Sequence, residues 1–404
     1  MKIVFVNSLY APTVIGGAER VLQSLAEKLL AAGHEPVVVC MAEEPGVRTD
    51  TVNGVRVHRI GLRNLYWPFP ADDRPGALKP IWHAIDTYNY AMARAVGAIV
   101  RRERPDVVHT HTIFGLSVQV WRAVARAGIP LVHTLHDYYV LCPRASMFRD
   151  GRNCEAQHPD CRVLAASRIG LSKRLDAVVS VSRFVLDRHL ALGAFASVPR
   201  QRVIHNMFRP PRPPGGHDRR AGGPLRVGFI GRLDPIKGVE LLLDEVGRLP
   251  IGGWELRIAG RGTPSYEAQL RSRVARPDIQ LLEWVDPHDF LDTIDVLVVP
   301  SVYHEPLGTV MIEALSHGVP VIGSRRGGTP ELIEDGVTGL LFDPDTPGAL
   351  RAVLERLVAE PSLLDAMHAA CVARARDFGP SSIVAEHLAL YAAVAARATG
   401  ASVR

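Results

Sequence analysis

The fold of the second half of the chain is decided by residues 294–333, which read IDVLVVPSVYHEPLGTVMIEALSHGVPVIGSRRGGTPELI. Asp295–Val299 is a short β-branched run, which is typical of a buried parallel strand. Gly308 leads into an apolar stretch at helical spacing that Gly318 ends, and a second buried strand, Val319–Ile322, follows. The succession of strand, loop, helix and strand predicts a parallel α/β sheet.

The start of the predicted helix is a candidate anion site. Its first N–H groups have no partner inside the helix and carry the positive end of the helix dipole. Glu305 lies just before this helix and Glu313 lies within it. A carboxylate accepts hydrogen bonds in pairs, so each could bind two neighbouring hydroxyls of a ribose or a hexopyranose. The alternative is that Glu305 is a capping acid and Glu313 a solvated helix carboxylate.

This stretch resembles the nucleotide-sugar site of retaining glycosyltransferase family four, whose members have the GT-B fold. The resemblance rests on the pattern PSxxxEPLGTVMIEALSHGVPVIGSxxGGTPELI. It implies that Glu305 faces the donor sugar and that Glu313 holds the ribose hydroxyls. It also places Gly308 and Thr309 at the donor phosphate, with Val310 beside them.

The resemblance has one departure and one further consequence. Pro306-Leu307 stands where many family members have Gly-Phe, and it leaves both glutamates in register. The family pattern places the nucleotide base near Trp284 and Val285.

Upstream of this stretch, the run GRLDPIKG places Arg232 and Lys237 five residues apart on the loop after a predicted strand. Such a loop suits a diphosphate, because ligands of open α/β sheets lie at the carboxyl ends of strands. The run matches the family's diphosphate clamp, whereas isolated cations on a loop are usually solvated. Two cations and a helix start would bind the diphosphate without a metal. We therefore expect no metal and no cofactor besides the UDP- or GDP-linked donor.

The first half opens with a strand, a loop, an amphipathic helix and a strand, which is a βαβ unit. Its loop contains Gly16-Gly17 but no G-x-G-x-x-G dinucleotide fingerprint. A double glycine alone indicates a tight turn. The resemblance implies that Gly16 and Gly17 come close to the donor phosphates.

A second informative stretch of the first half is PLVHTLHDYYVLCPR. The predicted strand Leu131–Leu135 delivers His136 to its carboxyl end, where side chains can line a site. A lone histidine there would more often be structural. The sequence HDYYVLCPR resembles a subgroup of the family, which implies that His136 approaches the transferring sugar.

Three cysteines, Cys142, Cys154 and Cys161, lie close together in the sequence, with His158 near the last two. Three thiolates and an imidazole would suit tetrahedral zinc. The spacing is not that of a zinc finger or ribbon, so we expect free thiols.

Length and composition predict a two-domain soluble α/β protein. At 404 residues the chain is too long for one core, and 47% hydrophobic with 22% charged residues is ordinary for a globular protein. The net charge of +5 suits phosphate-bearing ligands or an anionic membrane, and no nucleic-acid-binding module appears. No run of roughly 18 apolar residues occurs, so we expect a cytoplasmic protein, with peripheral contact at the inner membrane face left open.

The predicted domains are residues 1–206, a linker over 207–224, a nucleotide-sugar domain over 225–380, and a helix over 381–404 that returns to the first domain. In the first domain, a long helix is expected from Ala84 to Arg102. The loop before it, RNLYWPFP, either offers its aromatic residues to a membrane or acceptor lipid or folds them underneath.

We therefore expect two Rossmann-like domains facing each other across a cleft, and a retaining hexosyltransferase. The donor would be a UDP- or GDP-sugar, and the acceptor a hydroxyl of a glycan or lipid-linked molecule in polysaccharide biosynthesis. The alternatives are a nucleotide-sugar epimerase or phosphorylase on the same fold, and a catalytically silent partner subunit.

Overall fold

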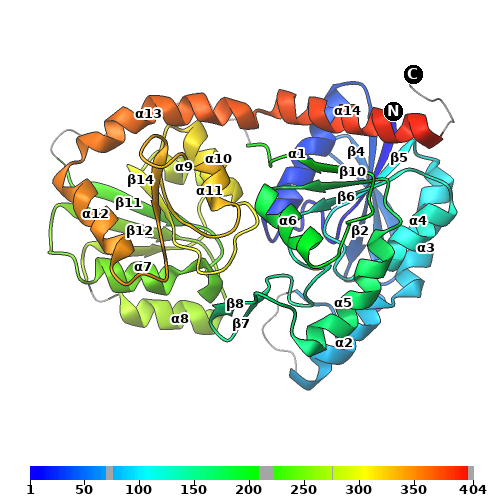
Figure 1. Cartoon of the computed structure of the whole chain (residues 1–404), viewed down its shortest axis with the longest axis horizontal. Coiled ribbons are helices and arrows are strands. Elements are labelled where there is room, and N and C mark those ends of the chain that lie inside the picture. Colours follow the sequence, from blue (N-terminus) through cyan, green and yellow to red (C-terminus); the bar gives the residue numbers. More distant parts are fainter. Residues whose placement is uncertain (70–75, 209–222, 275, 399–404) are drawn as a thin grey trace. The chain divides into compact units, whose positions relative to one another are not determined.

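The computed structural model describes residues 1–69, 76–208, 223–274 and 276–398 (Figure 1). The chain forms two compact units. The first comprises Met1–Met147, Cys154–His205 and Pro380–Arg404, and the second comprises Phe148–Asn153 and Asn206–Gly379. Most of the predicted linker over 207–224 lies outside the described residues, as do Pro70 of the aromatic loop and the last six residues, 399–404.

The first unit is built on one sheet whose described strands follow the order β10-β9-β6-β5-β1-β2-β4-β3. Only the edge strand β3 runs antiparallel among these strands. The central strands are continuous hydrophobic runs, as expected when helices cover both faces of a parallel sheet. The elements are β1 (Lys2–Val6), α1 (Gly17–Ala31), β2 (Glu35–Ala42), β3 (Val47–Val52), β4 (Val55–Gly61), α2 (Lys79–Thr87), α3 (Tyr90–Glu103), β5 (Val107–Thr110), α4 (Gln119–Arg126), β6 (Leu131–Leu135), α5 (Pro159–Ser172), β9 (Ala177–Ser180), α6 (Arg183–Ala191), β10 (Arg200–Val203) and α14 (Pro380–Ala398).

The second unit is built on a parallel sheet of order β13-β12-β11-β14-β15-β16, which is the strand order of a doubly wound Rossmann fold. Figure 1 shows α7 and α8 along one side of this sheet and α9, α10 and α13 along the other. The elements are the hairpin β7 (Phe148–Arg149) and β8 (Arg152–Asn153), then β11 (Leu225–Ile230), α7 (Val239–Val246), β12 (Trp254–Ala259), α8 (Pro264–Arg273), β13 (Ile279–Leu282), α9 (Pro287–Leu291), β14 (Val296–Val299), α10 (Thr309–Ser316), β15 (Val321–Ser324), α11 (Thr329–Leu332), β16 (Gly339–Phe342), α12 (Ala349–Ala359) and α13 (Ser362–Ala375).

The strand order of the second unit reverses between β11 and β14. In open α/β sheets, ligands bind beyond the carboxyl ends of the strands at such a reversal, because the two crossover connections leave in opposite directions and open a crevice. The loops after β11 and β14 flank this point, and they carry Lys237 and Glu305.

The predicted long helix from Ala84 to Arg102 is wrong, because the chain breaks it into α2 and α3 at Tyr88-Asn89. Asn89 is the N-cap of α3: its Oδ1 accepts from the Met92 N–H at 3.0 Å, and its Nδ2 donates to Arg63 O at 2.8 Å. Both hydrogen bonds favour a helix start at this position.

The aromatic residues of the loop RNLYWPFP fold inward. The Trp67 and Phe69 rings lie 5.7 Å apart, and Phe69 lies 6.0 Å from Phe114. Trp82 donates from Nε1 to Tyr66 O at 3.0 Å. Trp67 and Phe69 are thus partly buried against the core of the first unit.

The last helix, α14, runs over Pro380–Ala398 and groups with the first unit. Its Tyr391 side chain hydrogen-bonds His109 Nδ1 at 2.7 Å. None of the helices in the described ranges is both long enough and apolar enough to cross a membrane.

Candidate functional site

The centre of the candidate site is an ion pair between Lys237 and Glu305. The loop after β11 forms a short turn, Pro235–Lys237, that is capped by Asp234 and ends at Lys237. The Lys237 ammonium donates to Glu305 Oε2 at 2.6 Å and to Oε1 at 2.9 Å. Glu305 is only 5% exposed, so its charge depends on these partners rather than on water.

Two hydroxyls complete the surroundings of the Glu305 carboxylate. Ser301 Oγ donates to Oε2 at 2.9 Å, and Tyr303 Oη donates to Oε1 at 2.9 Å. Burial alone would raise the pKa of Glu305, but the charge of Lys237 and these hydrogen bonds outweigh burial and hold the pKa below its ordinary value. Glu305 is therefore ionised at neutral pH and fixed in direction.

The backbone of Glu305 is also held in place. Gly328 N–H donates to Glu305 O at 2.7 Å. Gly327 has φ +58°, and a Cβ built there would lie 2.0 Å from Glu305 O. Only glycine fits this left-handed position against the carbonyl, so the double glycine of the motif allows the chain to approach Glu305 closely.

Gly308 is the N-cap of α10, and it has no side chain with which to cap the helix. A helix start without a side-chain cap can offer its first N–H groups to an anion. Thr309 and Val310 form the first turn, and Glu313 follows Thr309 by four residues and therefore lies on the same helix face. The start of α10 is close to the ion pair, since a Cβ on Gly308 would lie 4.0 Å from Glu305 Cγ.

Arg232 lies on the same loop as Lys237 but does not join the ion pair. Its side chain is half exposed and forms its own ion pair with Asp234 at 3.2 Å. Val285 follows β13, two strands away from β11 in the sheet, and the neighbouring Trp284 is 54% exposed. Of the predicted residues in this unit, the structure thus brings Lys237, Glu305 and Gly308 together, with Arg232 beside them.

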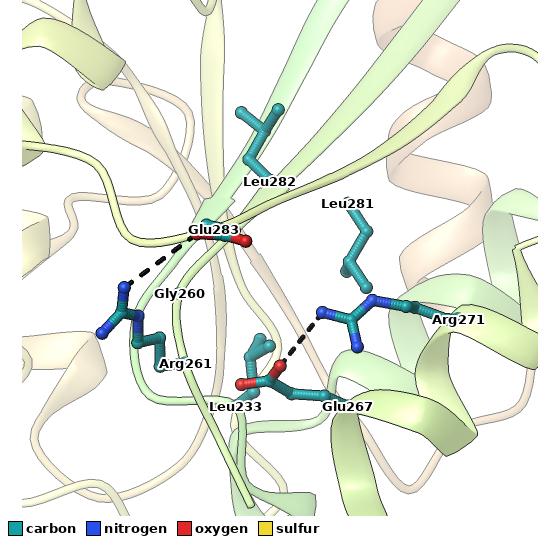
Figure 2. Close-up of a pocket in the computed structure, with 8 residues that line it drawn as sticks. All are labelled: Leu233, Gly260, Arg261, Glu267, Arg271, Leu281, Leu282 and Glu283. Atoms are coloured by element: carbon teal, nitrogen blue, oxygen red, sulfur yellow. Dashed lines mark hydrogen bonds and ion pairs between the residues drawn. The ribbon is translucent and has the colours of Figure 1, made fainter. Parts of the chain in front are cut away.

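A pocket of about 170 Å³ opens beside the Arg232 loop, at the carboxyl ends of β11, β12 and β13 (Figure 2). Figure 2 shows two arginine–glutamate pairs at this pocket, Arg261 with Glu283 at 4.0 Å and Arg271 with Glu267 at 3.1 Å. The lining consists of Leu233, Gly260, Arg261, Glu267, Arg271, Leu281, Leu282 and Glu283. Such a mixture of apolar floor and charged rim suits a small polar ring.

The predicted glycines of the first unit lie at the start of α1. Gly16 is the N-cap and Gly17 the first residue of the helix. Gly16 N–H donates to Glu19 Oε2 at 2.7 Å, so a glutamate of the first turn satisfies this N–H group. In the sheet of this unit, the loop follows β1, one of the two strands at the reversal of strand order.

His136 follows β6 and lies half-buried beside other imidazoles of the first unit. Its Nε2 is hydrogen-bonded to His111 Nδ1 at 2.9 Å, and the two rings stack at 5.2 Å. Desolvation, together with the charge of His387, lowers the pKa of His136 to about 3. His136 is therefore neutral at physiological pH, with one ring nitrogen donating and the other accepting.

The three clustered thiols also meet in the first unit. Burial raises the pKa of Cys161 to about 11, and the neighbouring Cys142 and Cys154 add to this shift. Across the described residues, no group of three His, Cys, Asp or Glu side chains is arranged to hold a metal ion. That the working enzyme is metal-free stays a prediction.

Comparison with known proteins identifies the family. Residues 16–207 match the glycosyl transferase 4-like domain, and residues 224–360 match the glycosyl transferases group 1 family. A D-inositol 3-phosphate glycosyltransferase of Thermobispora bispora is 30% identical over 312 residues, which cover 71% of this chain and 70% of the relative. The chain belongs to glycosyltransferase family four. It is therefore a glycosyltransferase enzyme, and the predicted resemblance is confirmed.

Other relatives of this glycosyltransferase agree in length and fold. An uncharacterised 42.6 kDa protein in the cps region of Klebsiella pneumoniae is 31% identical over 82% of this chain and 87% of its own length. The sucrose-phosphate synthase of Thermosynechococcus elongatus has a TM-score of 0.78 at 21% identity, covering 98% of this chain and 99% of that chain. Anabaena Alr3699/HepE in complex with UDP-glucose has a TM-score of 0.70 at 21% identity, covering 96% and 99%. The predicted GT-B fold class is confirmed by these matches.

The sequence analysis did not identify two side chains that donate hydrogen bonds to the Glu305 carboxylate, Ser301 and Tyr303. Ser301 was present in the pattern PSxxxE, four residues before Glu305, and that spacing could have suggested the contact. Tyr303 had no comparable signal, because the direction of a loop side chain does not follow from a strand or helix period.

Proposed function

We propose that this glycosyltransferase moves a hexose from a UDP- or GDP-sugar to a hydroxyl of a glycan or a lipid-linked acceptor, with retention of the anomeric configuration. The observation that carries this proposal is the ion pair of Lys237 and Glu305 beside the uncapped start of α10, where the strand order reverses. An anionic diphosphate and a sugar bearing hydroxyls are the ligands that such a pair of neighbouring groups fits.

Lys237 and the start of α10 would stabilise the leaving diphosphate as the glycosidic bond loosens. An ammonium has three N–H donors, and Lys237 directs them to Glu305 and, at the longer distance of 3.3 Å, to Tyr303 Oη. A phosphate oxygen would most readily replace the hydrogen bond from Lys237 to Tyr303 Oη, because it is the longest of the three. Arg232 would leave its exposed pairing with Asp234 to bind the same diphosphate, so that no metal is needed.

Glu305 would orient the sugar rather than attack it. Its two oxygens already accept from Lys237, Ser301 and Tyr303, so the carboxylate is a rigid acceptor for a sugar hydroxyl. Glu313 would bind the ribose hydroxyls from α10. The roles that the family resemblance implies for Gly16, Gly17 and His136 stay predictions.

Similar proteins support a nucleotide sugar as the donor. The solved HepE structures contain UDP and UDP-glucose, and the Klebsiella relative lies in a cps region. In this chain the pocket beside the Arg232 loop and the half-buried Val285 are the candidates for the side on which the base is bound.

The lipid-linked form of the acceptor has some support in the first unit. Leu78, Ile81 and Tyr88 are exposed apolar residues spaced three and seven apart, so they share one face at α2. Lys79 and Arg63 are exposed nearby, and a basic apolar face suits an anionic lipid surface. This face takes the place of the aromatic loop as the candidate for peripheral membrane contact.

The proposal is tested by calorimetry with UDP and GDP, followed by a screen of UDP- and GDP-sugars for slow hydrolysis in excess chelator. We expect one nucleotide to bind and one donor to be hydrolysed without added metal. Lys237→Ala should weaken donor affinity about ten- to a hundredfold, because a charge-assisted hydrogen bond of roughly 1.5–3 kcal/mol is lost. Isomerised sugar would indicate an epimerase, and activity that returns only with Mg or Mn would contradict the metal-free clamp.

A further inference from the structure

A short hairpin from the first half of the sequence reaches the loop that carries Glu305. Residues 148–153 form β7 and β8 and group with the second unit, whereas the residues on either side of them group with the first. Its turn is Asp150-Gly151, with φ +52° and +74°. Two positive φ values at an Asp-Gly pair are typical of a two-residue hairpin turn that fixes strand register, and Phe148 accordingly pairs with Asn153.

The side-chain amide of Asn153 holds two peptide groups of the Glu305 loop. Its Nδ2 donates to Val302 O at 2.9 Å, and its Oδ1 accepts from the His304 N–H at 2.8 Å. These two peptide groups flank Tyr303. The Asn153 amide thus donates to the residue before Tyr303 and accepts from the residue after it.

Tyr303 is the residue that this arrangement immobilises. Its hydroxyl donates to Glu305 Oε1 at 2.9 Å, and Lys237 Nζ lies 5.2 Å from its ring centre. The rest of the loop is held by Val302 N–H, which donates to Ile236 O at 3.0 Å, and by the contact of Gly328 with Glu305 O. Asn153 adds two hydrogen bonds to the segment between these two fixed points.

We propose that Asn153 is a positioning residue of the donor site, which sets the direction of the Glu305 carboxylate by fixing the backbone around Tyr303. Asn153 need not touch the donor. Its effect on turnover rests on the proposed function, whereas its effect on the loop does not. Neither the family pattern nor sequence spacing points to this residue, which lies 149 residues from Val302.

The loop is tested first in the ligand-free protein, by amide hydrogen exchange of residues 300–308. Asn153→Ala should raise exchange in this segment about tenfold or more, because two hydrogen bonds that oppose local opening are lost. Asn153→Asp should resemble Asn153→Ala, since a carboxylate cannot donate to Val302 O. Arg152→Ala is the matched control, because Arg152 is exposed on the same hairpin and should leave exchange unchanged.

The second measurement separates positioning from a general loss of structure. In Asn153→Ala, turnover of the hydrolysed donor should fall about tenfold, while affinity for free UDP or GDP stays within about threefold of the wild type. Unchanged exchange, or an equal loss in Arg152→Ala, would overturn the proposal. So would a parallel loss of nucleotide affinity and turnover. If the wild type neither binds a nucleotide nor hydrolyses a donor, the proposed function fails, and exchange alone still decides the role of Asn153 in the loop.

Discussion

The Lys237 ammonium lies 2.6 Å from one oxygen of Glu305 and 2.9 Å from the other, so one cation serves both oxygens of a carboxylate from a different loop. The side chain of Lys237 is 22% exposed and that of Glu305 only 7%. The ion pair is therefore charge-balanced, and removing either partner leaves the other in a position from which water is largely excluded.

A double-mutant cycle on Lys237 and Glu305 should show strong coupling. Lys237→Met leaves a buried carboxylate without its cation and should reduce the free energy of unfolding by about 2–4 kcal/mol. This loss is smaller than for a fully buried ion pair because Lys237 is partly exposed. Adding Glu305→Gln removes the unpaired charge. The double variant should therefore lose about 1–2 kcal/mol less than the sum of the two single losses. The measurement is urea unfolding at neutral pH, and additive losses within about 0.5 kcal/mol would show that the pair is not coupled.

The stability of the first unit should fall on mild acidification. Burial lowers the pKa of several histidines in this unit below the ordinary value of 6.5. The pKa falls to about 3 for His133 and His136, and to about 4 for His83, His189 and His387. The unfolded chain thus takes up protons below about pH 6.5 that the folded unit refuses, and acid favours unfolding. The histidines are His83, His109, His111, His133, His136, His189 and His387.

Three carboxyls oppose this effect. Burial raises the pKa of Asp86 and of Asp137 to about 6 and raises the pKa of Glu19 above its ordinary value, so the folded unit holds protons there that the unfolded chain releases. The histidines outnumber them, so we expect the midpoint of thermal unfolding to fall by several degrees between pH 7.5 and about 5.5. Calorimetry over this range is the measurement. If the midpoint of thermal unfolding stayed constant or rose on acidification, the imidazoles would be taking up protons in the folded protein.

The cluster of Cys142, Cys154 and Cys161 should bind no metal and should not be needed for activity. Burial keeps the Cys161 thiol protonated at neutral pH, whereas zinc binding requires thiolates. Elemental analysis of the purified enzyme should show no zinc, and Cys154→Ser should leave donor hydrolysis unchanged. One zinc per chain that is lost together with activity in Cys154→Ser would reverse this conclusion.

The strands and the helix around the glutamate loop were accessible from sequence because they follow from local periodicity, whereas the GT-B fold and the roles of the two glutamates were implied by the family resemblance. The apolar runs before Pro300 and after Gly318 specify neighbouring strands, and Gly308 marks the helix start between them. The strand bounds moved by only one or two residues, from Asp295–Val299 to Val296–Val299 and from Val319–Ile322 to Val321–Ser324.

Features set by long-range contacts were not accessible. The break between α2 and α3 depends on Asn89 binding Arg63 O, and the Glu305 loop depends on Asn153, far away in sequence. A polar side chain that bonds to a distant backbone leaves no period in the sequence, so such contacts appear only once the chain is folded.

We propose that the second unit binds the ribose of the nucleotide through Glu313 and the transferring sugar through Glu305. Glu313→Ala should weaken binding of free UDP or GDP as well as of the full donor, since both contain the ribose. Glu305→Gln, which keeps the size of the side chain, should bind the free nucleotide nearly as the wild type does but lower turnover, because its partner is present only in the full donor.

The most direct test is calorimetry of these two variants with the free nucleotide, paired with steady-state rates on the full donor. We expect Glu313→Ala to bind the free nucleotide more weakly than the wild type. We expect Glu305→Gln to bind the free nucleotide nearly as well as the wild type but to turn over the donor more slowly. Equal losses of nucleotide affinity in both variants would contradict the division of roles, and wild-type behaviour in both would remove this unit as the donor site.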